Sequence, residues 1–148
     1  MLKLGFPNNW ISLMMDCVST SRLSFVINGN VIGDVRSTRG IRQGCPLSPY
    51  LFLLCVEAFS ALIHGSEQDG NILGFRCCRG SPLVSHLFFA DDSINFCRAS
   101  VASCEAIKSV LQVYEKGSGQ QINLQKSCIT FSPNVDFHIR KDIQQALG

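Results

Sequence analysis

The sequence predicts an α+β fold with mainly antiparallel strands. Three observations lead to this class. Two long apolar segments repeat at helical spacing, two short apolar segments flank an Asn-Gly pair, and two more flank a pair of aspartates. No internal repeat or linker divides the 148 residues, and this length suits one domain better than two. We therefore expect hairpins and helices sharing one core.

The first predicted element is a helix over residues 9–18. Pro7 and Asn8 provide its start signal, and apolar side chains follow at steps of three and four residues. Residues 23–27 and 31–35 are then predicted as strands. The dipeptide between them, Asn28-Gly29, accepts the positive φ angles of a two-residue turn, so these strands should form a hairpin.

A polar loop over residues 37–47 precedes a strongly apolar helix. Ser48 can cap this helix and Pro49 can be its first residue. We expect it to end at His64, with Gly65 beyond its end. Apolar side chains cover most of its circumference, which predicts burial on more than one side.

A second hairpin is predicted near the middle of the chain. Its strands cover residues 83–89 and 93–97, and Ala90, Asp91 and Asp92 join them. Two adjacent aspartates alone favour a plain polar turn. Like charges on a rigid hairpin repel each other, however, and a hard cation such as Mg²⁺ would relieve that repulsion.

The rest of the chain predicts one strong and two weak elements. An amphipathic helix covers residues 101–116 and ends before a glycine-rich segment. Residues 122–124 and 128–131 are predicted as a short final hairpin, and residues 136–147 as a polar terminal helix.

The composition is apolar for a free-standing domain. Hydrophobic residues make up 46% and charged residues 16%, which excludes a disordered chain. The longest uninterrupted apolar run covers residues 50–56, which is too short for a membrane span, and no secretory signal is visible. Because no export signal is visible, we expect an intracellular protein whose eight cysteines are reduced, with a disulfide framework as the lesser alternative. None of these cysteines has the spacing of a zinc site.

The positive charge is concentrated in one segment. The net charge is only +2, but the stretch from Arg22 to Arg42 holds four arginines and one carboxylate, Asp34. Such a basic strip can bind phosphates through counterion release. A solvated arginine-rich loop explains the charge at least as well.

Residues 39–49 form the second informative segment, with the sequence RGIRQGCPLSP. Backbone amides at a helix start, together with the guanidinium groups of Arg39 and Arg42, can bind phosphate. Gly44 would let a flat base pair approach the backbone closely. The alternative is an ordinary entry into a helix.

In this order and separation, the two segments resemble the reverse transcriptase domain of non-LTR retrotransposons, the LINE-type elements, most closely those of plants. Further matching segments lie at residues 2–7, 26–29 and 119–127. The resemblance covers residues 1–133, leaving residues 134–148 as a C-terminal tail. It implies a partial polymerase palm, in which antiparallel hairpins pack on helices.

The resemblance also implies a function, RNA-directed DNA polymerisation. In this family an RNA template, a DNA primer and dNTPs are the partners, and two Mg²⁺ (or Mn²⁺) ions support nucleotidyl transfer to the primer 3′ end. It implies that Asp91 is the main metal ligand and that Asp92 lies beside it. Lys126 matches a lysine near the incoming triphosphate, where it could act as general acid.

The resemblance assigns the template side of the site to the earlier segment. It implies that Gln43 and Gly44 touch the nascent base pair and the template. Arg39 and Arg42 lie where they could contact phosphate or template. No membrane partner is implied.

The family's other essential aspartate belongs to a strand that would precede Met1, so we expect this polypeptide alone not to polymerise DNA. A missing strand would also expose an apolar sheet edge, which predicts self-association. Two further interpretations stay open: a non-catalytic module that binds RNA or an RNA–DNA hybrid, and a decayed retroelement relic with no selected function.

Overall fold

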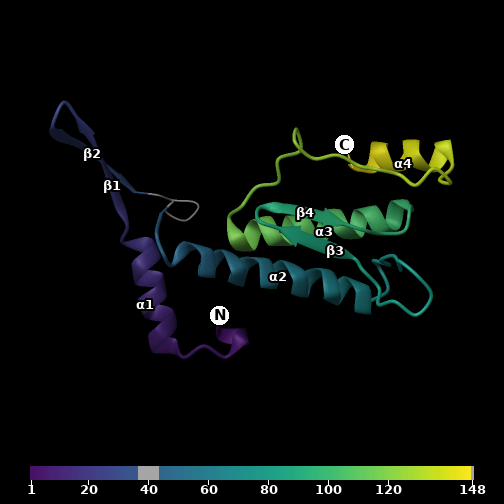
Figure 1. The fold of residues 1–148 in the computed structure, drawn as a ribbon, viewed down its shortest axis with the longest axis horizontal. Helices are drawn as coiled ribbons and strands as arrows, with labels where there is room; N and C mark the ends of the chain where they lie inside the picture. The colour runs from purple at the N-terminus through teal and green to yellow at the C-terminus, as the bar shows by residue number, and fades with distance from the viewer. Residues whose placement is uncertain (37–43, 148) are drawn as a thin grey trace. The chain divides into compact units, whose positions relative to one another are not determined.

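The computed structural model describes residues 1–36 and 44–147 (Figure 1). One short 3-10 helix, four α-helices and two antiparallel hairpins make up the regular structure of these residues, which confirms the α+β class. The chain divides into two compact units, Met1–Leu54 and Cys55–Gly148. Each unit is described by itself below.

The first unit opens with a short 3-10 helix, η1 (Leu2–Leu4), and helix α1 (Asn8–Ser19). The extended backbone of Pro7 begins α1, as predicted. Phe6, which precedes the helix, stacks on Trp10 in its first turn with ring centroids 4.4 Å apart, which fixes the entry of the chain into the helix.

The first hairpin pairs β1 (Arg22–Ile27) with β2 (Asn30–Arg36). Asn28 and Gly29 have φ angles of 50° and 80°, so both central turn positions are left-handed, and the predicted turn is confirmed. Residues 37–43 of the predicted polar loop lie outside the described residues.

Helix α2 (Ser48–Gln68) continues past its predicted end. Gly65 lies inside the helix, and the left-handed residue that ends it is Gly70, with φ 75°. The amide of Gly70 donates to the carbonyl of Glu67 at 2.9 Å, and the amide of Asn71 donates to that of Ser66 at 2.9 Å. A glycine inside a helix lowers helix stability by only about 1 kcal/mol. The helix can therefore continue through Gly65 and end at the left-handed Gly70.

The predicted burial of this helix on more than one side is wrong. Leu51, Phe59 and Ile63 are its buried side chains, whereas Tyr50 and Leu53 are mostly exposed. By length and composition alone, α2 is also the one helix of the described residues that could cross a membrane.

The second hairpin, β3 (His86–Phe89) with β4 (Asp92–Asn95), is shorter than predicted. Its loop consists of Ala90 and Asp91 only, because Asp92 already pairs with Phe89 as a strand residue. The residues before β3 pair elsewhere: Val84 exchanges two backbone hydrogen bonds with Phe75, at 3.0 and 2.9 Å.

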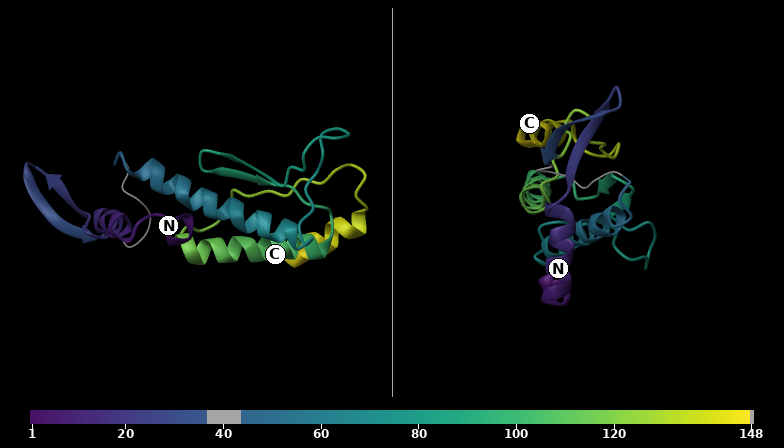
Figure 2. Two further views of the ribbon diagram at one scale, coloured as in Figure 1. Left: turned by 90° about the horizontal axis from the view of Figure 1, so that it is seen from below. Right: turned by 90° about the vertical axis from the view of Figure 1, so that its left-hand side faces the viewer.

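Helix α3 (Val101–Ser118) packs against the core of the second unit, to which α2 contributes Phe59 and Ile63. Ser100 caps its start, and Gly119 at φ 73° ends it, two residues later than predicted. The rings of Phe59 and Tyr114 stack with centroids 4.6 Å apart. Figure 2 shows α3 alongside the C-terminal part of α2, with the β3–β4 hairpin over them. The buried centre of this core consists of Phe59, Ile63 and Ile72.

The predicted final hairpin is wrong, since the described residues 119–136 contain no strand. Asn123 organises a turn instead: its side-chain Oδ1 accepts from the amides of Gln125 and Lys126 at 3.1 and 3.3 Å. The amide of Ile122 donates to the carboxylate of Glu115 at 2.7 Å. Side chains therefore take the hydrogen bonds that a strand ladder would need.

Helix α4 (Phe137–Leu147) confirms the predicted terminal helix. Asp136 caps it by accepting from the amide of His138 at 2.8 Å. Ile143 is fully buried, and Lys108 of α3 donates to the carbonyls of Ala146 and Leu147 at 3.0 and 3.4 Å. These contacts fix α4 against α3.

Candidate functional site

The two predicted catalytic aspartates lie at the tip of the β3–β4 hairpin. We call residues 89–92 the acidic turn. Ala90 has a left-handed φ of 51°, which lets a two-residue loop close between Phe89 and Asp92. Asp91 belongs to the loop and Asp92 begins β4, and both carboxylates are exposed. Both residues are therefore open to solvent at the tip of the hairpin.

The hairpin has one packed face and one exposed face. His86 and Phe88 lie on the packed face and are partly buried, and Phe88 contacts Phe59 with ring centroids 5.3 Å apart. Phe89 alternates to the other face and is 84% exposed. Asp92, its direct partner, shares that face. One face of the hairpin thus packs on the core, while the face that carries Phe89 and Asp92 is open to solvent.

His86 connects the hairpin to α2 through one hydrogen bond, which no spacing in the sequence indicates. Its Nε2 lies 2.9 Å from the hydroxyl of Ser60, and its Nδ1 lies 2.9 Å from the hydroxyl of Ser85. Burial lowers the pKa of His86, and the nearby His64 lowers this pKa further. The sequence contains one indication of this contact: His86 is a polar residue directly before the apolar residues Leu87, Phe88 and Phe89.

The carboxylates of the acidic turn suit a hard cation only as a partial site. Among residues 1–36 and 44–147, no three His, Cys, Asp or Glu side chains gather closely enough to hold a metal ion. Carboxylate oxygens are ligands of Mg²⁺ and Mn²⁺, and Mg²⁺ usually keeps several waters. Asp91 and Asp92 therefore fit one such ion whose remaining ligands come from water or substrate.

Lys126 lies in the turn after α3 and is exposed. Its amide donates to the carbonyl of Asn123 at 3.0 Å, which fixes the backbone but leaves the side chain in solvent. Within the described part of the chain, no hydrogen bond or ion pair joins Lys126 to the acidic turn. The structure therefore places it on a separate element.

Of the predicted template-side residues, only Gly44 is described by the structure. Arg39, Arg42 and Gln43 lie outside the described residues. Gly44 has φ 80°, and apart from its chain neighbours no atom of residues 1–36 or 45–147 lies within 4 Å of the place where a Cβ would stand. This backbone conformation favours glycine, and the open space beside it is compatible with close approach of a ligand.

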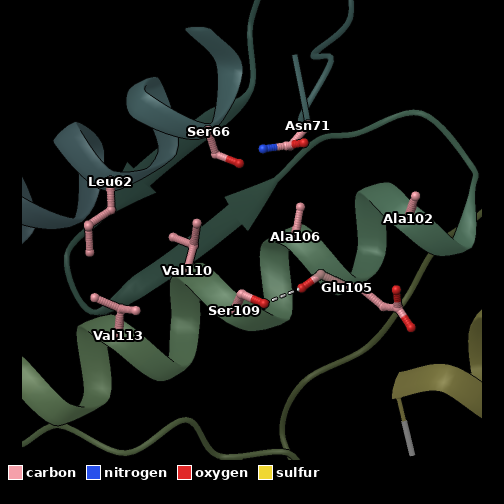
Figure 3. Close-up of a pocket in the computed structure, with 9 residues that line it drawn as sticks. All are labelled: Leu62, Ser66, Asn71, Ala102, Glu105, Ala106, Ser109, Val110 and Val113. Atoms are coloured by element: carbon pink, nitrogen blue, oxygen red, sulfur yellow. Dashed lines mark hydrogen bonds between the residues drawn. The ribbon is translucent and has the colours of Figure 1, made fainter. Parts of the chain in front are cut away.

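A groove of about 400 Å³ lies between α2 and α3, on the second unit (Figure 3). Its walls include Leu62 from α2 and Val110 and Val113 from α3. Ser109 donates to the Glu105 carbonyl of its own helix, so that hydroxyl is already engaged. The groove contains none of the predicted site residues and no set of catalytic groups.

Comparison with known proteins agrees with the sequence resemblance. An uncharacterized mitochondrial protein of Arabidopsis thaliana is 49% identical over 71 residues, 48% of this chain and 58% of that protein. The transposon TX1 uncharacterized 149 kDa protein of Xenopus laevis is 27% identical over 135 residues, 90% of this chain and 10% of that protein. The chain thus spans less than two thirds of either relative.

No solved structure matches the chain. The family model described as reverse transcriptase (RNA-dependent DNA polymerase) matches residues 1–143. That match covers nearly all of the 148 residues and confirms the expected resemblance. The chain therefore belongs to the reverse transcriptase family.

Proposed function

We propose that this chain is part of the palm of a LINE-type retrotransposon reverse transcriptase, and that its acidic turn holds a divalent ion beside a primer 3′ end. Residues 1–133 would form the palm portion, with α4 as a terminal addition. One observation supports this most: Asp91 and Asp92 stand at the exposed tip of a hairpin whose other face is packed on the core.

In this proposal the residues of the chain position the reactants. Asp91 and Asp92 would hold Mg²⁺ or Mn²⁺, which when bound lowers the pKa of the attacking hydroxyl and stabilises the leaving oxygen. Gln43 and Gly44 would contact the nascent base pair and the RNA template. Lys126 would protonate the leaving pyrophosphate.

The arginines of the earlier segment would act on phosphates. Arg39 and Arg42 would bind the template backbone or the incoming dNTP through charge-assisted hydrogen bonds. Guanidinium groups suit this role because their planar donors match phosphate oxygens in pairs.

A manganese titration tests whether the acidic turn binds an ion. The D91N and D92N variants each remove one carboxylate charge, and we expect each to weaken Mn²⁺ binding by about tenfold or more, as followed by electron paramagnetic resonance. D69N is the matched control, because Asp69 is an exposed aspartate of another turn. Equal Mn²⁺ affinity in the D91N/D92N double variant and the unchanged chain would refute the proposal.

We infer that the 148 residues by themselves do not extend a primer. Two-metal catalysis needs carboxylates from more than one strand, and within the described residues no third ligand joins Asp91 and Asp92. Purified chain with a primed RNA template, dNTPs and Mg²⁺ or Mn²⁺ should give no extension. Extension that D91N abolishes would overturn this inference.

A second function, binding of nucleic acid without chemistry, is favoured by the first hairpin. Arg22 and Arg36 stand directly opposite each other, and only Asp34 offsets them, with its carboxylate 3.1 Å from Arg22. All three side chains are exposed. The hairpin thus carries a net positive charge, and in the sequence it is followed directly by the segment that contains Arg39 and Arg42.

Binding of an RNA–DNA hybrid at several salt concentrations separates the two functions. A non-catalytic module should bind more weakly as salt rises, should tolerate D91N, and should lose affinity in the R22Q/R36Q variant. Absence of binding at low salt would exclude this function. Absence of both hybrid and Mn²⁺ binding would favour the relic interpretation.

A further inference from the structure

Five polar side chains gather where the β3–β4 hairpin meets α2. They are Ser60, His64 and Glu67 of α2, and Ser85 and His86 at the start of the hairpin. The three α2 residues are spaced by four and three positions and therefore share one face of the helix. His64 Nδ1 lies 2.6 Å from the Glu67 carboxylate, and the two imidazole rings meet edge to face with centroids 5.2 Å apart.

His86 is the polar link between the hairpin and the helix. Its bond with Ser60 joins residues 26 positions apart, and among the described residues it is the only side-chain hydrogen bond between the hairpin and residues 55–68 of α2. The hydroxyl of Ser85, itself buried, holds the other ring nitrogen. Both nitrogens are thus engaged, which fixes the ring orientation.

The anchored end and the acidic turn are opposite ends of one short ladder. His86 pairs with Asn95 at one end, and Phe89 pairs with Asp92 at the other. The ladder has four residue pairs in all, so only two pairs lie between the anchored pair and the pair at the tip. Because a two-stranded ribbon is marginal alone, the packing of His86 and Phe88 must set its orientation.

We propose that His86 is a positioning residue for the acidic turn, and that gain of a proton by His86 releases the hairpin from α2. The consequence for ion binding rests on the proposed function, whereas the anchoring stands on the hydrogen bonds alone. The orientation of the hairpin that carries Asp91 and Asp92 would therefore depend on pH.

The groups around His86 give the direction of this dependence. His64 disfavours a second positive charge and Glu67 favours it, while burial disfavours it most. Asn95, opposite His86, is uncharged, and Tyr114 of α3 stays neutral because burial raises its pKa. The docked hairpin thus prefers neutral His86, and docking should weaken as the pH falls through about 6.5, the ordinary pKa of histidine.

Hydrogen exchange of the β3–β4 amides between pH 5.5 and 8 tests the anchor in the full chain. After correction for intrinsic rates, protection should fall by about tenfold across this range. H86Q should lower protection at pH 8 and abolish its dependence on pH. H138Q is the matched control and should change neither, since His138 is exposed and lies on α4.

Two further variants separate titration from simple loss of packing. S60A removes one hydrogen bond but keeps the imidazole, so protection should fall at every pH with its slope retained. H64Q removes the imidazole that lowers the pKa of His86, so the slope should become shallower. An identical pH profile in the unchanged chain and in H86Q would overturn the anchor, as would a flat profile in the unchanged chain.

Manganese binding at pH 7.5 completes the test. If the unchanged chain binds Mn²⁺, H86Q should bind it several-fold more weakly; equal affinity despite lost protection would overturn the positioning role. If the unchanged chain binds no Mn²⁺, the proposed function fails, and the exchange data still decide whether His86 anchors the hairpin.

Discussion

Gly74 lies where the segment after α2 passes against the backbone of Val84. A Cβ built on Gly74 would stand 2.4 Å from the Val84 carbonyl oxygen and 2.9 Å from the Ser85 amide nitrogen. Backbone atoms cannot move aside as the end of a flexible side chain can. Position 74 therefore has no room for a side chain larger than that of glycine.

The first prediction follows from this contact. G74A should lower the free energy of unfolding by about 1–3 kcal/mol, because the added methyl group forces the two segments apart. G65A is the matched control: outside the backbone of its own helix and its chain neighbours, no atom of the described residues lies within 4 Å of its Cβ, and it should be stabilising by up to about 1 kcal/mol within a helix. Urea unfolding measures both. Equal stability of the two variants would contradict the close approach.

Cys97 gives a second prediction, on pH. Burial, the largest cause, and the neighbouring Cys104 together raise the pKa of Cys97 to about 12. The folded state therefore keeps a proton that the unfolded chain loses above about pH 9. The stability contributed by this thiol is complete below pH 9 and is lost as the pH rises from about 9 towards 12.

Alkylation at pH 8 checks the same thiol. Iodoacetamide should modify the exposed Cys77 and Cys78 more than about tenfold faster than Cys97, because the thiolate is the reactive form. Mass spectrometry of peptides gives the rates. Modification of Cys97 at the rate of Cys77 would show that its site is open to water.

Residue-scale prediction from the sequence succeeded where the signal was local. Asp91 could be assigned to a turn because two apolar segments flank it, whereas Asp92, predicted in the same turn, is the first residue of β4. The anchor at His86 could not, since its partner Ser60 lies 26 residues away on another element. A long-range hydrogen bond leaves no pattern in sequence spacing.

At the scale of elements, helix starts and tight turns were the predictable parts. The Asn28-Gly29 turn was confirmed because its backbone demands are met by those two residues alone. The ends of α2 and α3 were predicted too early, since Gly65 and Gly117 are accommodated inside helices. The predicted final hairpin was wrong because the amides of Gln125 and Lys126 donate to the side chain of Asn123 and form a turn there.

The third prediction concerns the docking of α4 on α3. Ile143 is fully buried, so I143A should cost about 2–5 kcal/mol of stability through lost burial and the cavity left behind. I139A is the control on the same helix: Ile139 is 40% exposed, and its loss should cost about 0.5 kcal/mol. Urea unfolding compares them. Equal costs would mean that α4 is not docked.

For the whole molecule, the exposed apolar surface of the first hairpin predicts self-association. Val26 and Val31 are direct partners and are 70% and 73% exposed, and Phe25 beside them is 60% exposed. Apolar strands with open edges favour contact between chains.

Sedimentation at increasing protein concentration tests this fourth prediction. The unchanged chain should associate, and the V26T/V31T variant, which keeps strand propensity, should shift towards monomer. S24T is the control, since it alters the same hairpin without removing apolar surface. A monomer with a sharp cooperative melt at every concentration would contradict the prediction.

The location of a bound ion tests the central claim most directly. Mn²⁺ added to isotopically labelled chain broadens the amide signals nearest to it in nuclear magnetic resonance spectra. The account predicts selective broadening of Asp91 and Asp92, lost in the D91N/D92N variant and retained in D69N. Broadening centred on another group of residues, or none at all, would contradict it.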